Sequence, residues 1–193
     1  MSTISTGNYT IGGIDIYFEA SIAHASLLDT TGTVQVGSPF RVSSRSLGNI
    51  VSAEFNPDIT YVEHYISKKG KRKKDKMVSN MESLTIPFVF DEVNTNNMKR
   101  FFLASLPDTG DTDKLAVLDA PLVEGSVSIN FLTEVGQSLI YSIPKATIRP
   151  DGALPMNTED WWNGPMVLEV LHYDTDHWAS KPYGLLDTGV YSN

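Results

Sequence analysis

Apolar and polar residues alternate along much of this sequence, and this period of two limits the possible folds more than any other feature. Successive side chains of a β-strand point to opposite faces, so alternation predicts strands with one face in a core. The clearest example runs from Leu84 to Phe90. Other alternating segments lie at 14–18, 34–36, 51–55, 59–66, 127–131, 139–143, 146–148 and 166–171. Gly, Pro, Asn and Asp separate these segments, so the sequence predicts a mainly β protein, a β-sandwich or barrel of about eight strands with one flanking α-helix and a long hairpin loop.

Pro87 lies within the clearest of these strands. Proline has no backbone N–H to donate to a neighbouring strand, and it is therefore found mainly at the edges of sheets. We expect the strand that contains Pro87 to lie at an edge or to turn this residue outward.

A single segment has the spacing of an amphipathic helix. Residues 91–94 offer capping side chains, and Met98, Phe101 and Phe102 follow at spacings of three and four. These spacings place the three apolar side chains in one stripe. We expect the helix to end near Pro107 and to pack this stripe against one face or one end of the β body.

The length of the chain favours a single domain. A chain of 193 residues is long enough for one substantial domain and short for two. With 41% apolar residues, it can bury a core. We expect one domain over residues 1–193, with its core in 12–175, a projecting basic loop at 66–80 and a loosely packed C-terminal arm at 178–193.

The sequence contains no cysteine, which excludes disulfides, thiolate metal sites and a cysteine nucleophile. No apolar run approaches the ~20 residues that cross a bilayer. The N-terminal residues have neither the positive charge nor the apolar segment of a secretory signal. We therefore expect folding in a reducing cytoplasm, no insertion into a membrane, and stability from packing or oligomerisation.

The charges of the chain are strongly segregated. Seven of the fifteen Lys and Arg residues lie within nine positions, and they are Lys68, Lys69, Lys71, Arg72, Lys73, Lys74 and Lys76. Outside this basic window, which contains one carboxylate, eight basic residues face 22 carboxylates, a balance of −14 compared with −8 for the whole chain. Like charges at this density repel each other, so the segregation indicates a partner of opposite charge.

Three interpretations of the basic window are open. It can be a solvated hairpin tip, a surface that pairs with the acidic surface of other copies of the chain, or a nucleic-acid-binding patch. The sequence favours pairing between copies, because the rest of the same molecule supplies the complementary charge. Nucleic-acid binding is disfavoured because the window lacks the interleaved aromatic residues on which bases stack.

The best candidate metal ligands are two histidines and two aspartates near the C-terminus, His172, Asp174, Asp176 and His177. Imidazole and carboxylate groups together suit a divalent cation. No partner ligand elsewhere in the chain has a telling spacing, so a strand that ends in a solvated acidic loop is the favoured interpretation. The sequence predicts no metal site.

The pair Trp161 and Trp162, beside Glu159 and Asp160, is the best candidate for a sugar platform with two catalytic acids. Adjacent residues in an extended segment face opposite ways, however, so packing of one Trp on the β body is favoured. The sequence has no nucleophile elbow of the GxSxG type and no glycine-rich phosphate loop in the required context. We expect no catalytic residue, no cofactor and no enzymatic activity.

The order of these elements resembles a known family. The features that carry the resemblance are, in order, the strand from Ser46 to Ile50, Phe55 to Asp58, Tyr61 to Tyr65, the basic window, Leu84 to Phe88, the helix through Asn97, Met98 and Phe101, the paired strands from Gly125, and the turn from Arg149 to Gly152. Over roughly residues 12–175 this order resembles the major tail tube protein of long-tailed bacteriophages, a fold shared with contractile-tail tubes and with the tube of type VI secretion systems. The strongly basic loop and the extension after Trp178 depart from the family pattern.

The resemblance implies a structural role in a virion. It implies rings, usually hexameric, whose sheets join around a channel and which stack through a long hairpin loop that is often disordered before assembly. The basic residues from Lys68 to Lys76 are then expected to contact other subunits or rings. The implied partners are other copies of the chain, the tape measure protein and DNA in the channel, and tail terminator and distal tail proteins at the ends. The implied location is the virion tail, assembled in the cytoplasm of a bacterial host.

Other functions remain open at the level of sequence. A tail terminator or a distal-tail or baseplate ring protein of the same fold is the main alternative. A carbohydrate-binding or hydrolytic β module that uses the tryptophan pair, and a β-barrel that binds nucleic acid through the basic window, are alternatives from other classes.

Overall fold

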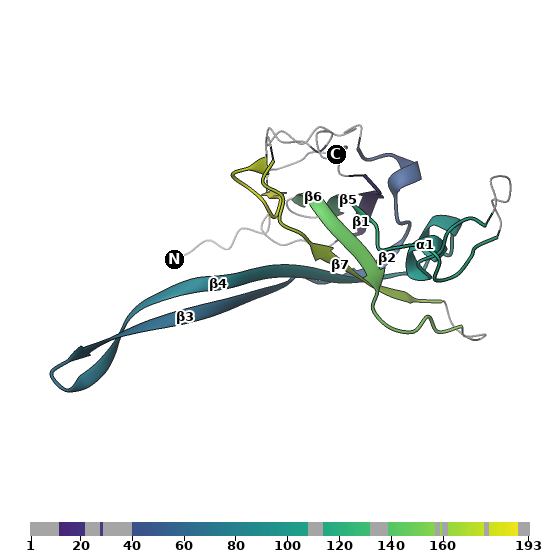
Figure 1. Cartoon of the computed structure of the whole chain (residues 1–193). Helices are drawn as coiled ribbons and strands as arrows, with labels where there is room; N and C mark the ends of the chain where they lie inside the picture. The colour runs from purple at the N-terminus through teal and green to yellow at the C-terminus, as the bar shows by residue number, and fades with distance from the viewer. Residues whose placement is uncertain are drawn as a thin grey trace, which may run out of the picture.

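The computed structural model describes residues 12–21, 28, 40–107, 114–131, 139–156, 159, 162–175 and 178–188. Its elements are β1 (Ile14–Glu19), the 3-10 turn η3 (Ser43–Arg45), β2 (Ile50–Ala53), β3 (Asn56–Lys68), β4 (Lys71–Phe90), α1 (Thr95–Phe101), β5 (Glu124–Phe131), β6 (Leu139–Pro150), β7 (Gly164–Val170) and β8 (Leu185–Asp187) (Figure 1). The described part is therefore mainly β with one α-helix, which confirms the predicted fold class. The alternating segment at 34–36 lies outside the described residues.

All pairings in the sheet are antiparallel. The strand order is β1-β5-β6-β7-β4-β2, with β3 added beside β4 and β8 beside β6. The two ends of this order meet, because the N–H of Leu47, just before β2, donates to the carbonyl of Ile16 in β1 at 2.8 Å. Tyr17 and Ser46 form a bridge at the same place. The sheet thus rolls up like a small barrel.

The core of the barrel is formed by the alternate residues that the sequence pattern predicts. The inward side chains are Ile16 and Phe18 of β1, Ile86, Phe88 and Phe90 of β4, Val127 and Ile129 of β5, Ile143 and Ile148 of β6, and Met166, Leu168 and Val170 of β7. All of these residues are buried. Each strand contributes one apolar face, and this burial is the main force that holds the rolled sheet together.

Helix α1 covers part of this core. The side chain of Asn94 accepts a hydrogen bond from the N–H of Asn97 at 2.9 Å and so caps the first turn. Phe101 is buried, and Met98 and Phe102 are partly buried against the same core, as the apolar stripe predicts. The sequence predicts that the helix ends near Pro107, but in the structure it ends at Phe101.

The early end of α1 has a local cause. Leu103 has a φ of 45°, which lies in the left-handed region that ends helices. After this residue the chain reverses, and the N–H of Leu118 donates to the carbonyl of Phe102 at 3.0 Å. The carbonyls of Lys99 and Arg100 in the last turn accept from the N–H groups of Ala104 and Leu103, so the helix does not continue.

Of the two alternatives predicted for Pro87, an edge strand or an outward position, the structure shows the second, because β4 does not lie at an edge. This strand pairs with β7 on one side and with β2 and β3 on the other. The carbonyl of Pro87 accepts a hydrogen bond from the N–H of Glu54 at 3.0 Å, so the nitrogen of Pro87 faces the break between β2 and β3. The missing N–H therefore removes no regular ladder bond. The ring of Pro87 lies on the outer face and is half-buried, so its outward orientation was predicted correctly.

A second, smaller apolar cluster covers the outer face of β1, β5 and β6. Its buried members are Leu28, Phe40 and Trp178. Beneath it the outward residues of β5, including Ser126 and Ser128, are buried although they are polar. The segment 178–188 therefore packs on the barrel, where β8 pairs with β6, and is not the loosely packed arm that the sequence predicted.

Candidate functional site: a projecting hairpin

The most distinctive feature of the molecule is the hairpin formed by β3 and β4. The strands are joined by Lys69 and Gly70, with φ values of 54° and 73°. A two-residue turn with positive φ at both positions matches the right-handed twist of the strands it connects. The predicted loop at 66–80 is therefore strand except at these two residues. Its basic residues are compatible with strand structure because they alternate between two solvent-exposed faces.

The hairpin extends beyond the barrel. Strand β4 pairs with β7 only from Leu84 to Phe90, and its earlier part pairs with β3 alone among the described residues. The free ribbon of β3 from Asp58 to Lys68 has a length of roughly 35 Å at the usual rise of a strand. Figure 1 shows this ribbon leaving the body without folding back on the described part of it.

Two irregularities shape the ribbon. The register shifts between Thr60 and Tyr61 and again between His64 and Tyr65. In both places β4 carries one extra residue, as in a β-bulge. Such bulges increase the local twist of a ribbon, so the outer part of the hairpin is turned relative to its base.

Both faces of the ribbon carry apolar side chains that the described residues leave uncovered. The register places Ile59, Tyr61, Tyr65 and Met77 on one face and Val62, Ile66 and Val78 on the other. All seven are between 40% and 60% exposed. An isolated two-stranded ribbon is marginally stable in water, and exposed apolar surface of this extent marks an interaction site. The hairpin therefore has the features of a surface that binds a partner.

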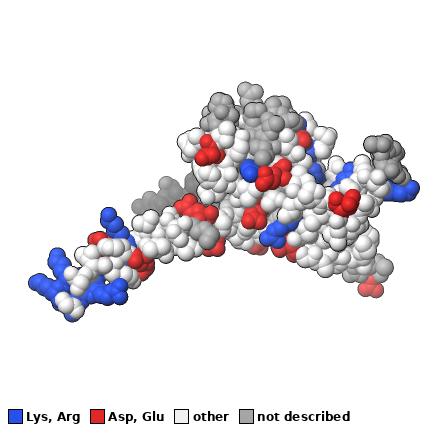
Figure 2. Space-filling view, in the orientation of Figure 1, with Lys and Arg blue, Asp and Glu red and all other residues white. Residues whose placement is uncertain are grey.

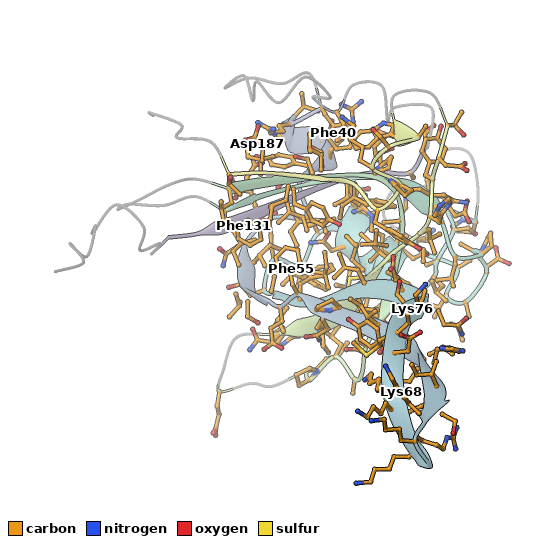
Figure 3. All side chains as sticks on the ribbon, turned by 90° about the vertical axis from the view of Figure 1, so that its left-hand side faces the viewer. Phe40, Phe55, Lys68, Lys76, Phe131 and Asp187 are labelled. Carbon is orange, nitrogen blue, oxygen red and sulfur yellow. The ribbon has the colours of Figure 1, made fainter. Side chains whose placement is uncertain are left out.

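The basic residues gather at the end of the hairpin. Figure 2 shows Lys and Arg clustered there, whereas Asp and Glu lie nearer the body and on it. All seven predicted contact residues are exposed, and Figure 3 shows Lys68 and Lys76 on the same arm. The structure thus brings the predicted residues together in one projecting, positively charged tip.

Two of the basic residues have partners within the hairpin. Lys74 forms an ion pair with Glu63, which also accepts a hydrogen bond from the hydroxyl of Tyr65. The Lys74 ammonium and the Tyr65 hydroxyl together hold the pKa of Glu63 below its usual value. The guanidinium of Arg72 lies 5.2 Å from the centre of the Tyr65 ring, within the range of a cation–π contact. These contacts order one face of the tip.

The other five basic residues make no ion pair with any residue that the structure describes. They are Lys68, Lys69, Lys71, Lys73 and Lys76. Their mutual repulsion raises the free energy of the isolated subunit. An anionic partner surface would relieve this repulsion.

The base of the hairpin is held in place by aromatic residues. The ring of Phe55 lies 5.5 Å from that of Phe131 and 5.7 Å from that of Tyr141, and Figure 3 shows Phe55 beside Phe131. The Tyr141 hydroxyl donates to the carbonyl of Tyr183 at 2.5 Å, and the Tyr183 hydroxyl donates to the carbonyl of Glu82 in β4 at 3.5 Å. Sequence alternation predicts a strand at Phe55 but does not identify these contacts, because they join five separate segments of the chain.

The structure describes only two of the four candidate metal ligands, His172 and Asp174. The ring of His172 packs edge-on against Tyr183 at 5.5 Å. Among the residues that the structure describes, no group of three or more His, Asp and Glu side chains could hold a metal ion. Asp176 and His177 lie outside the described residues.

The structure does not test the candidate sugar platform, against which the sequence already argued. Of its four members, Glu159 and Trp162 lie in the described part of the chain, and Asp160 and Trp161 lie outside it.

Among the residues that the structure describes, no helix is long and apolar enough to cross a membrane.

Comparison with known proteins adds no assignment. No protein-family model matches the chain, and no curated protein matches it significantly.

Proposed function

We propose that this protein is a structural subunit of a bacteriophage tail tube, in which stacked rings form a conduit for DNA. The observation that carries the proposal is the projecting hairpin, with exposed apolar side chains on both faces and five tip lysines that form no ion pair with any described residue. A surface of this kind is incomplete in a single copy. Binding to other copies would cover its apolar residues and neutralise its charge.

The charge distribution supports assembly from identical subunits. The basic window carries six net positive charges, from seven basic residues and one carboxylate, and the rest of the chain carries a balance of −14. A subunit with a cationic tip and an anionic body can bind the next copy through two different surfaces. Such heterologous contacts close into rings or propagate as tubes.

The same charge balance suits a channel for DNA. An acidic inner wall would repel the phosphate backbone, so DNA would gain no counterion release by binding and could pass through. In this proposal the tape measure protein and DNA occupy the channel, and tail terminator and distal tail proteins bind the tube ends. The protein acts in the virion tail after assembly in the bacterial cytoplasm, and it has no catalytic role.

Electron microscopy of the purified protein tests this proposal. We expect hollow tubes in negative stain at high protein concentration. Replacing residues 60–81 by Asn-Gly would join the directly opposed residues Ile59 and Glu82 through a short turn. This shortened hairpin should leave monomers or single rings, with an unchanged circular dichroism melting curve for the barrel.

Several outcomes would contradict the proposal. A protein that stays monomeric at all concentrations, or tubes formed equally well by the shortened variant, would refute it. Single closed rings from the unaltered chain would indicate a terminator or distal-tail protein instead. Salt-sensitive binding to oligonucleotides or binding to glycans by a monomer would indicate the other two functions.

A further inference from the structure

Helix α1 lies at the opposite end of the body from the hairpin (Figure 1), and residues of this helix line a pocket. It has a volume of about 240 Å³, and its lining includes Phe18, Arg100, Leu103, Ala104, Val123 and Ile148. The floor is apolar and buried, because Phe18, Ala104 and Ile148 are buried residues. The rim is open to solvent, since Val123 is exposed.

The pocket contains the positive charge of Arg100, which forms no ion pair within 4.0 Å of any residue that the structure describes. The Nη1 atom of Arg100 is buried and has no hydrogen-bond partner among the described residues. Its guanidinium lies 5.2 Å from the centre of the Phe18 ring. Burial lowers the pKa of Arg100 to about 10, and only the charge of Glu19 opposes this shift. Glu19 is itself paired with Arg45.

The chemistry of the pocket defines its ligand. A buried guanidinium is costly unless an anion pairs with it, and a carboxylate is its best-fitting partner. Asn96 and Lys99 also line the pocket, but the rest of the lining is apolar, so apolar groups beside the carboxylate complete the fit. The fitting ligand is therefore an acidic side chain within an apolar patch.

The base of the hairpin offers such a patch. Glu82 lies directly opposite Ile59 in the register, and Tyr61 follows on the same face. Ile59 and Tyr61 are exposed, and the Glu82 carboxylate makes no ion pair with any residue in the described part of the chain. Most other carboxylates there already have partners, as Asp91 has with Asn49.

The two surfaces cannot meet within one subunit. Glu82 is eight residues from Phe90 along β4, a distance of roughly 26 Å. Helix α1 begins beyond Phe90, so Arg100 lies at the far end of the body from Glu82.

We propose that the pocket beside α1 binds the Ile59, Tyr61 and Glu82 patch of a neighbouring copy, with an ion pair between Arg100 and Glu82. This inference rests on the proposed function and adds the acceptor site for the hairpin base. The contact joins two different surfaces on opposite sides of the subunit, so it propagates from copy to copy. The basic tip lies farther along the same hairpin and reaches a third copy or the next ring.

Charge exchange between the two partners tests the pair. Arg100→Glu and Glu82→Arg should each raise the critical protein concentration for tube formation by about tenfold or more, because each leaves like charges buried together. The double variant should restore assembly to within about threefold of the unaltered chain. Asp58→Arg is the matched control, since Asp58 lies on the other face of β3, and it should not rescue Arg100→Glu.

A second variant separates assembly from folding. Arg100→Met keeps the length and apolar stem of the side chain and removes the unpaired charge. The melting temperature of the free subunit should stay the same or rise, whereas the critical concentration should rise about tenfold. A lower melting temperature with unchanged assembly would indicate a structural role alone and would overturn the inference.

Engineered disulfides locate the contact directly, because the chain has no native cysteine. A Glu82→Cys protein mixed with a Val123→Cys protein of different mass should form a mixed disulfide dimer under assembly conditions. Val51 is also exposed, so a Val51→Cys protein serves as the control. With the Glu82→Cys protein it should give at least about tenfold less mixed disulfide dimer. Equal yields with Val51→Cys would contradict the proposed contact.

The outcomes distinguish the two proposals. If the unaltered chain forms tubes and both single charge variants assemble equally well, the pocket inference fails and the tube function stands. If the unaltered chain never assembles, both fail.

Discussion

Tyr141 shows how one side chain can connect several parts of this molecule. Its ring is part of the barrel core and contacts Phe55 at the base of the hairpin. Its hydroxyl donates to the carbonyl of Tyr183 near the C-terminal end of the chain. Burial raises the pKa of Tyr141 to about 12 from its usual 10.0, because the phenolate would lose its hydration.

Because of this pKa shift, the free energy of unfolding is expected to depend on pH above about pH 10. The folded state holds the Tyr141 proton more tightly than the unfolded state does, so the contribution is complete below pH 10 and is lost as the pH rises towards 12. We expect the free energy of unfolding to fall by about 2–3 kcal/mol over this range. Tyr141→Phe should show a smaller fall, measured by urea unfolding at pH 8 and pH 11.5. An equal fall in both proteins would contradict this assignment.

Two residues show where sequence reasoning stops at this scale. Asn97 is buried, and its side-chain amide donates to the carbonyls of Leu47 at 2.7 Å and Glu92 at 3.0 Å. Arg100 appears in the sequence as an ordinary basic residue at the end of a helix. Both roles depend on segments brought close only by the rolled sheet, so local spacing carries no sign of them.

At the scale of elements, the strands were predictable and the extent of the hairpin was not. Alternation from Leu84 to Phe90 identifies β4 because one face of that segment enters the core. The basic residues beyond it have low strand propensity and no core to face, so the sequence indicates a loop. In the structure the alternation simply continues to a two-residue turn at Lys69 and Gly70.

The turn can be tested by one substitution. Gly70 has a φ of 73° with open space around it, so Gly70→Ala adds backbone strain without a clash. Amide hydrogen exchange in the outer hairpin should become about fivefold faster, from a cost of about 1 kcal/mol. The melting temperature of the barrel should not change. Gly13→Ala is the control, because Gly13 also has open space and no left-handed φ, and exchange in the hairpin should then stay as it is.

At the scale of the whole molecule, charge segregation would govern how copies meet in the proposed tube. The tip is cationic and the rest of the chain is anionic, and five lysines of the tip have no ion-pair partner among the described residues. Attraction between copies therefore has a long-range electrostatic part and a short-range apolar part.

Salt separates the two parts. Raising NaCl from about 0.1 M to about 0.5 M shortens the screening length from about 10 Å to about 4 Å. The critical concentration for tube formation should rise several-fold, as measured by sedimentation. A variant with glutamine at the five unpaired lysines should assemble more weakly at low salt and respond less to added salt. Salt-independent assembly of the unaltered chain would show that the tip charge has no part in it.

The register shifts in the hairpin have a consequence for how free subunits avoid one another. Beyond the barrel, both outer edges of the ribbon present backbone N–H and C=O groups that could template amyloid-like stacking. The extra residues in β4 near Thr60 and His64 disturb the even spacing that such stacking requires. Together with the lysines, they would keep free subunits apart until the proposed tube incorporates them.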